Sequence, residues 1–308
     1  MSKGLSIAEL EQRIRDHVNT PRLHGVLSSG KNWAQLCSSM DAIGDAELGI
    51  DAFLSSDFPT DPGGAYLAIY GVLQLLFVEQ DATQAIRSIF DVKGPLPGPA
   101  KDVRDIRNWS IGHPTSTRDG ASHFIARYSM SKEGFRLLSL QSGGESVYRS
   151  VNLRRLIHDQ REVLAVVLEG VLDKLIHEEQ THRDMFKGER LVDLFPKDIG
   201  YHVSKVMEGA LTDDEGRRTY ASTNVRFLSE VVEKFFLRIS ERGRGQTFAT
   251  DVVRDLRYPL LELRKFFEGG GSLTPEGARI FAFFVEHELK RLYDIAGEID
   301  TEYASPPL

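Results

Sequence analysis

Three residues near the middle of the chain carry side chains that could act together on a phosphate group. Arg107 and Asn108 are adjacent, and His113 follows directly before a proline. A guanidinium group is permanently charged, and its planar fork of N–H groups fits phosphate oxygens. An imidazole exchanges protons near neutral pH, and a carboxamide both donates and accepts hydrogen bonds. These groups are suited to phosphodiester transfer without a metal, in which the histidine moves a proton and the arginine stabilises the growing charge.

The sequence between Arg107 and His113 decides whether these two side chains can meet. In a regular α-helix they would point about 240° apart around the helix axis. Gly112 can adopt the left-handed conformation that ends a helix. Pro114 forces the residue before it into an extended conformation. We therefore expect the chain to turn back after Ile111 and to return the imidazole towards Arg107.

Two helices are predicted to position this motif. The motif ends a short charged helix over about residues 100–111, which follows a long helix over about 65–90. The most apolar window of the long helix, Ala65 to Val78, would span only about 21 Å, whereas the hydrocarbon layer of a membrane is about 30 Å thick. The sequence therefore predicts a buried core helix and no membrane span.

The remaining segments predict a mainly helical protein. Apolar and β-branched residues on both sides of a Gly-containing turn predict a β-hairpin at about 121–140. A long helix is expected from Val147 to about Phe186, and four more helices are expected after it. The predicted fold class is all-α: a helical bundle with an inserted hairpin and a second helical unit. The predicted domains are residues 1–187 and 188–308.

The motif at a helix end, with an apolar helix before it, resembles the R-polar-x(3–4)-H signature of HEPN domains. The resemblance covers about residues 30–185, and its specific part is short. It implies a bundle of four or five helices that dimerises, so that two motifs share one cleft. It further implies a metal-independent endoribonuclease without cofactor, acting on RNA in toxin–antitoxin or antiviral defence, with an antitoxin or defence-system partner. Other members of the family are non-catalytic and bind RNA, nucleotides or proteins.

The resemblance assigns roles to the residues of the motif. Arg107 and His113 would be catalytic, and Asn108 would support them. Glu79 and Asp81 stand where members of the family often carry an acidic residue near the site. The hairpin and the second helical unit are not parts of a minimal HEPN toxin, and they leave the substrate open.

Further basic residues are predicted to bind the substrate: Arg104, Arg154 and His158. The last two share one side of the long helix with Arg161, because they are spaced four and three residues apart. The alternative is a solvent-exposed helix face on which these residues pair with Asp159 and Glu162.

The motif itself also has an alternative interpretation. Arg107 could pair with Asp102 or Asp105 on the surface of the charged helix. His113 could cap the C-terminal end of that helix. The chain would then be a helical module without catalysis.

Composition excludes several other classes of protein. A formal net charge of −7 argues against a broad basic surface for nucleic acid, although not against a local one. With Cys37 as the single cysteine, neither an internal disulfide nor a cysteine-based zinc site can form. His177 and His182 are five residues apart, which is the wrong spacing for a metal site on a helix. These features, together with a polar N-terminus, predict a cytoplasmic protein with no metal.

Overall fold

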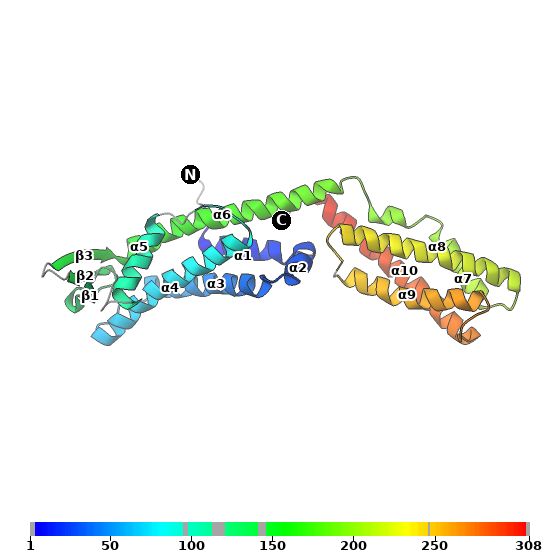
Figure 1. Ribbon diagram of the computed structural model, residues 1–308, viewed down its shortest axis with the longest axis horizontal. Helices are drawn as coiled ribbons and strands as arrows, with labels where there is room; N and C mark the ends of the chain where they lie inside the picture. The colour runs from blue at the N-terminus through cyan, green and yellow to red at the C-terminus, as the bar shows by residue number, and fades with distance from the viewer. Residues whose placement is uncertain (1–3, 95–97, 113–120, 141–145, 246, 306–308) are drawn as a thin grey trace. The chain divides into compact units, whose positions relative to one another are not determined.

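The computed structural model describes the chain except residues 1–3, 95–97, 113–120, 141–145, 246 and 306–308 (Figure 1). It contains two compact units. One comprises Met1–Val18 and Gly30–His177, and the other comprises Asn19–Ser29 and Glu178–Leu308. The domain boundary predicted after residue 187 lies ten residues beyond the last residue of the first unit. Most of the described residues are helical, so the predicted all-α class with a small β insert is confirmed.

The first unit is a helical bundle with a small sheet at one end (Figure 1). Its elements are α1 (Ile7–Val18), α3 (Trp33–Ser55), α4 (Pro62–Ile89), α5 (Gly98–Arg107), a π-helical turn (Asn108–Gly112), β1 (Ser122–Ile125), β2 (Gly134–Leu140), β3 (Ser146–Asn152) and most of α6 (Leu153–Met185). Helices α3 and α4 pack along each other. Asp61 caps α4 by accepting a hydrogen bond from the Gly64 amide, and Pro62 occupies the first turn.

One hydrophobic core joins α4, α5 and the sheet of the first unit. Leu73 and Leu76 of α4, Val103 of α5 and Leu137 of β2 are all completely buried. Each fully buried aliphatic side chain of this kind contributes roughly 1.5–3 kcal/mol to folding. The short helix α5 is therefore held firmly between a core helix and the sheet.

The sheet has one strand more than the sequence predicted. The hairpin of β1 and β2 is confirmed, but β3 pairs antiparallel with β2 from Ser146 to Asn152. The long helix was expected to begin at Val147, and it begins instead at Leu153. The β-branched and aromatic residues of β3 favour a strand. The Asn152 side chain then starts the helix by accepting a hydrogen bond from the Arg155 amide at 2.9 Å.

The second unit is a helical bundle with a core of its own. Its elements are α2 (Pro21–Ser28), the end of α6, a 3₁₀ turn (Leu191–Leu194), α7 (Ile199–Ala210), α8 (Glu215–Glu241), α9 (Phe248–Phe267) and α10 (Pro275–Ala304). Helices α7 to α10 bury one continuous set of apolar side chains. Thr274 caps α10, as its position before Pro275 suggests, by accepting a hydrogen bond from Gly277.

Helix α4 is the one described helix that is long and apolar enough to cross a membrane by length and composition alone. A third of its most apolar window is buried inside the structure. A core helix of a soluble protein passes the same test, and α4 also carries the fully buried polar residues Glu79, Gln80 and Thr83. Leu67 of the same window is 76% exposed, so α4 buries one face in the core and the buried core helix expected from the sequence is confirmed only in part.

Candidate functional site

The motif lies where α5 changes into a π-helical turn. Helix α5 ends at Arg107, and Asn108–Gly112 form the turn. A π turn closes its hydrogen bonds over five residues instead of four, and such turns occur frequently at functional sites. The wider turn brings Gly112 back towards Arg107, five residues earlier. The return of the chain was expected from the sequence, but a left-handed glycine was expected to produce it.

Gly112 contributes space rather than an unusual backbone conformation. A Cβ atom at this position would lie 2.8 Å from Nη1 of Arg107 and 3.1 Å from Oδ1 of Asn108. Its φ angle is not in the left-handed region, so that expectation was wrong. The backbone therefore passes directly against the guanidinium group immediately before His113. His113 itself lies outside the described residues.

Residues of α4 fix the guanidinium group of Arg107. The Oε1 atom of Gln74 accepts hydrogen bonds from Nε at 3.2 Å and from Nη2 at 3.0 Å. Nη1 donates to Oδ1 of Asn108 at 3.2 Å. The guanidinium carbon lies 4.6 Å from the ring centroid of Phe77, a distance at which a cation is attracted to the face of the ring. Three of the five N–H groups of Arg107 are thus used within the protein.

Arg104 contacts the same aromatic ring as Arg107. Its guanidinium carbon is 4.7 Å from the centroid of Phe77. It forms an ion pair with Asp81, and its Nε donates to Oε1 of Gln80 at 3.0 Å. The structure therefore brings together Arg104, Arg107, Asn108 and Asp81 of the predicted site residues.

Glu79 lies instead in the core, within a buried polar network. The side chain is 0% exposed, and its Oε2 accepts a hydrogen bond from Nε2 of Gln160 at 2.5 Å. Burial and the neighbouring Glu47 carboxylate raise the pKa of Glu79 to about 8. Glu47 also pairs with Arg161 at 2.9 Å. With a pKa of about 8, Glu79 is mainly protonated at neutral pH.

The buried network is connected to the motif. Nε2 of Gln80 donates to Oε1 of Gln160 at 2.6 Å, and Gln160 in turn donates to Glu79. Gln80 and Gln160 are both 0% exposed. Because Gln80 also accepts from Arg104, a continuous row of hydrogen bonds runs from Arg104 to Glu79. Glu79 thus supports the site only through other residues.

The sheet is joined to the motif through Trp109 of the π turn. The indole ring stacks on His123 of β1, with ring centroids 5.3 Å apart. The guanidinium carbon of Arg149, from β3, lies 4.7 Å from the Trp109 ring centroid. The predicted hairpin and the strand that follows it are therefore parts of the surroundings of the motif.

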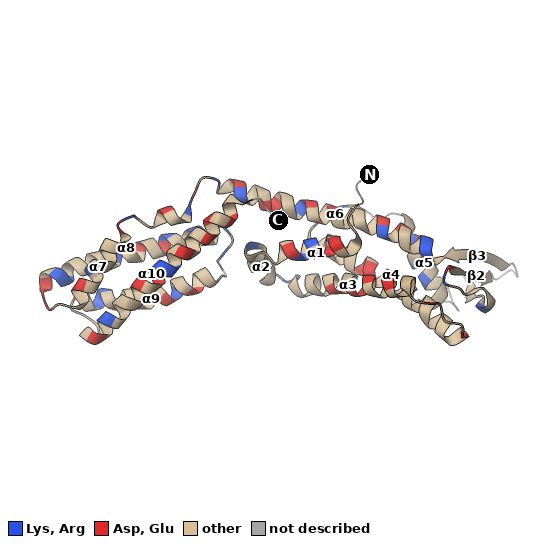
Figure 2. Ribbon diagram, turned by 180° about the vertical axis from the view of Figure 1, so that it is seen from behind, with Lys and Arg blue, Asp and Glu red and all other residues tan. Residues whose placement is uncertain are grey.

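The two basic residues predicted at the start of α6 are exposed. Arg154 forms an ion pair with Glu133 at 2.8 Å, and His158 is exposed on the next turn. Arg161, which shares their helix face, pairs with Glu47 and Asp51. The ribbon in Figure 2 is coloured blue, for Lys and Arg, at several positions on α5 and on the part of α6 beside it.

Two residues of α4 that contact the motif, Gln74 and Phe77, were not predicted, whereas Asp81 was. Gln74, Phe77 and Asp81 occur at intervals of three and four residues, which places them on one helix face. Gln74 is also the one polar residue that interrupts the apolar window of α4. That interruption, on the face of Asp81, is the signal in the sequence that could have identified this contact.

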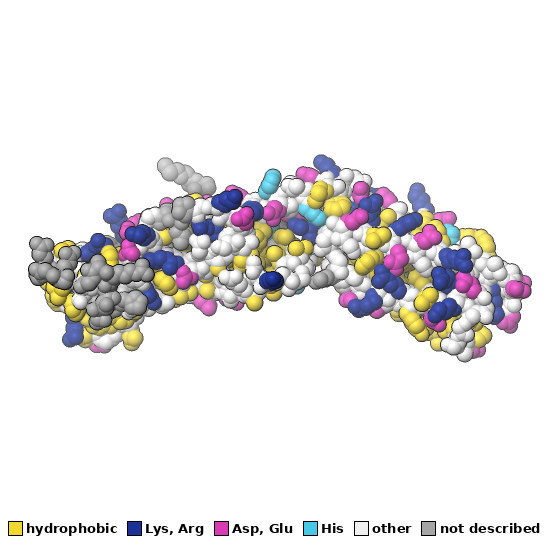
Figure 3. All heavy atoms as spheres, viewed as in Figure 1, with side chains coloured by type: hydrophobic (Ala, Val, Ile, Leu, Met, Phe, Trp, Pro, Cys, Tyr) yellow, Lys and Arg dark blue, Asp and Glu magenta, His cyan; other side chains and the backbone are white. Residues whose placement is uncertain are grey.

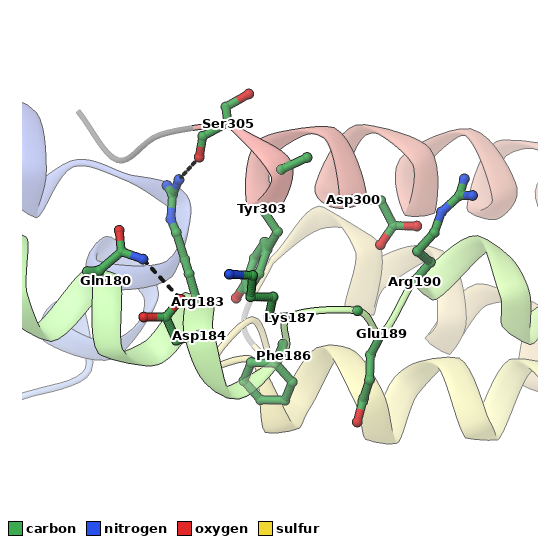
Figure 4. A pocket seen from close by; sticks show the side chains of 12 residues that line it. Gln180, Arg183, Asp184, Phe186, Lys187, Glu189, Arg190, Asp300, Tyr303 and Ser305 are labelled. Atoms are coloured by element: carbon green, nitrogen blue, oxygen red, sulfur yellow. Dashed lines mark hydrogen bonds between the residues drawn. The ribbon is translucent and has the colours of Figure 1, made fainter.

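The second unit contains a separate cavity of about 410 Å³ (Figure 4). Its lining mixes charges of both signs, among them Arg183, Lys187 and Asp300. Nη1 of Arg183 donates to the Ser305 carbonyl oxygen at 2.7 Å, and Asp300 accepts from the amides of Leu191 and Val192. These groups stabilise the ends of local elements.

Comparison with known proteins identifies no relative of this chain. No protein-family model matches it. No curated protein and no solved structure is significantly similar to it.

Proposed function

We propose that the first unit is a metal-independent endoribonuclease of the HEPN type that acts as a cytoplasmic homodimer. Arg107 and His113 are the catalytic residues of this proposal, and Asn108 supports them. The observation that carries it is the close approach of the Gly112 backbone to the guanidinium group of Arg107. His113 follows Gly112 directly in the sequence.

The chemistry needs one proton acceptor, one proton donor and a cation. The RNA 2′-hydroxyl loses its proton to a histidine and attacks phosphorus. The 5′-oxygen leaves and takes up a proton, and the products carry a 2′,3′-cyclic phosphate and a 5′-hydroxyl. The N–H groups of Arg107 that are not used by Gln74 and Asn108 would bind a phosphate oxygen as negative charge grows on it. A dimer would supply a second histidine to the same cleft.

The end groups of the cleaved RNA test this proposal. The wild-type protein should cleave single-stranded RNA in excess EDTA, and the new ends should be 2′,3′-cyclic phosphate and 5′-hydroxyl. Treatment with a phosphatase that opens cyclic phosphates, followed by mass spectrometry, distinguishes these ends from a 5′-phosphate. Cleavage that requires a divalent cation, or that leaves a 5′-phosphate, would refute the mechanism.

A second candidate function is a helical module that binds RNA, a nucleotide or a partner protein without cleaving it. The three internal hydrogen bonds of Arg107 favour this alternative, because they hold the guanidinium group within the protein. The same assay separates the two candidates. A module of the second kind leaves the RNA intact, whether it binds RNA, a nucleotide or a partner protein. A toxin or defence role, with an inhibitory partner, belongs to the first candidate.

The space at Gly112 gives a prediction for the site. In Gly112→Ala the new methyl group would displace the Arg107 guanidinium by several tenths of an ångström. Small misplacements of catalytic groups are costly, so we expect the cleavage rate to fall roughly tenfold. Gly44→Ala is the control, because nothing lies within 4 Å of a Cβ atom at that position. Equal rates in both variants would contradict the role of Gly112.

A further inference from the structure

The outer face of the sheet carries a row of exposed and half-buried apolar side chains. Phe124 of β1, Leu138 of β2 and Tyr148 of β3 are direct neighbours in the strand register, so they lie side by side across the sheet. Phe124 and Tyr148 are each 48% exposed. Residues on the opposite face, such as Phe135 and Leu137, are buried in the core. One face of the sheet is therefore buried in the core, and the other face carries partly exposed aromatic rings.

An arginine lies on this row. The guanidinium carbon of Arg136 is 4.6 Å from the ring centroid of Tyr148. Arg136 is exposed and is the register partner of Ser150, two residues beyond Tyr148 on β3. A flat, charged group and an aromatic ring thus form one continuous surface. Figure 3 shows hydrophobic and basic side chains side by side at this end of the first unit.

The charge of this region is opposite to that of the whole chain. Residues 122–155 contain six Arg or Lys and two Glu, whereas the chain has a net charge of −7. Of these cations, Arg136 lies on the outer face, whereas Arg149 lies on the opposite face and Arg154 is paired with Glu133. An excess of cations in one region of an acidic protein attracts polyanions to that region. Phosphate groups satisfy the cations, and bases can stack on the aromatic rings and on the guanidinium plane.

We propose that the outer face of this sheet binds single-stranded RNA by stacking unpaired bases on Tyr148, Arg136 and Phe124. This inference rests on the proposed function, since it says where the protein holds the single-stranded RNA that reaches the motif. Trp109 places the motif on the other face of the same sheet: it belongs to the π turn and packs against His123 of β1 and Arg149 of β3, which alternate with the outer-face residues Phe124 and Tyr148. The platform recognises bases that are not paired, because a duplex hides their faces.

Binding to a labelled oligouridine tests this proposal. A length of about 12 nucleotides is within the range that single-strand-binding modules cover. The experiment uses the full-length chain with His113→Ala, so that the probe stays intact. Fluorescence anisotropy should show a Kd roughly 5- to 100-fold higher for Tyr148→Ala, as expected for one lost stacked base. Tyr148→Phe keeps the ring and should bind as the parent does. An RNA duplex of the same length should bind weakly to all variants.

Tyr258→Ala is the matched control, because Tyr258 is an exposed tyrosine of the second unit, 62% exposed on α9. Arg136→Gln should lower the slope of log Kd against log salt by about 0.7, as expected for one lost phosphate contact on a single strand. The tryptophan emission spectrum and the thermal unfolding of each variant show whether the sheet, which contacts Trp109, is still folded.

Two outcomes would overturn the proposal. One is an unchanged Kd in folded Tyr148→Ala. The other is a Tyr148→Ala variant that no longer self-associates in a sedimentation experiment but binds RNA with unchanged affinity. That result would assign this face to a contact between protein chains. Failure of the nuclease proposal has a different signature: Tyr148→Ala still weakens binding, but wild-type protein leaves the RNA intact. If RNA is cleaved and Tyr148→Ala keeps the wild-type KM, the platform alone is refuted.

Discussion

His113→Ala is expected to lower the rate of RNA cleavage by roughly 10²–10⁴-fold, the range for loss of a positioned acid–base group. The reason is that no other histidine adjoins the Arg107–Asn108 pair in the sequence. The rate is measured in excess EDTA with RNA above its KM, so that a change in binding does not enter. Addition of imidazole should restore part of the activity if the lost function is proton transfer.

His287→Ala is the control for this experiment. Its side chain is 78% exposed in the second unit, and its Nε2 atom lies 3.9 Å from Oε1 of Glu288. It should cleave at the wild-type rate. Equal rates for His113→Ala and wild type would eliminate the proposed mechanism. Arg107→Lys adds a second check, because it keeps the charge but loses the planar fork that bonds to Gln74.

Glu79→Gln is expected to make the first unit more stable, by an amount that grows as the pH rises from about 5 to 8. The pKa of Glu79 is raised from 4.5 to about 8 by burial and by Glu47. Between these two values the unfolded chain releases the proton and the native protein keeps it. Native stability therefore falls with rising pH, by up to about 1.4 kcal/mol per pH unit from this group. Below pH 4.5 the contribution is fully present, and above about 8 it is lost.

The substitution removes this loss because a carboxamide cannot ionise. It has the shape of the carboxyl group, and its oxygen can still accept the hydrogen bond from Gln160. Urea unfolding monitored by tryptophan fluorescence measures the effect on the first unit specifically, since Trp33 and Trp109 both belong to it. Asp81→Asn is a suitable control, because Asp81 is largely exposed. Parallel pH profiles for wild type and Glu79→Gln would show that Glu79 ionises normally.

Periodic patterns were sufficient to predict the long helices of both units, but not the short helix α2. The cap at Thr274 and the proline after it mark the beginning of α10, and the apolar positions of α4 mark a core helix. Signals of this kind are local, because a cap or a helix face depends on residues a few positions apart. The hairpin was found for the same reason.

The third strand and the site's supporting residues depend on contacts between distant segments. The residues from Val147 to Val151 are also compatible with the start of a helix. The pairing of this segment with β2 makes it a strand. Gln160 contacts Glu79 and Gln80 across about 80 residues of sequence. No spacing rule within one helix could indicate that a predicted acidic site residue is buried beside a glutamine of another helix.

The row of hydrogen bonds from Arg104 to Glu79 has a direction. Arginine can only donate, so Gln80 must turn its oxygen towards Arg104 and its nitrogen towards Gln160. Gln160 must then present its nitrogen to Glu79. Each amide is thereby fixed in one of two orientations by its neighbour, and reversing one would require reversing the next. The cation of Arg104 at the protein surface thus determines which way the buried amide groups of Gln80 and Gln160 are oriented.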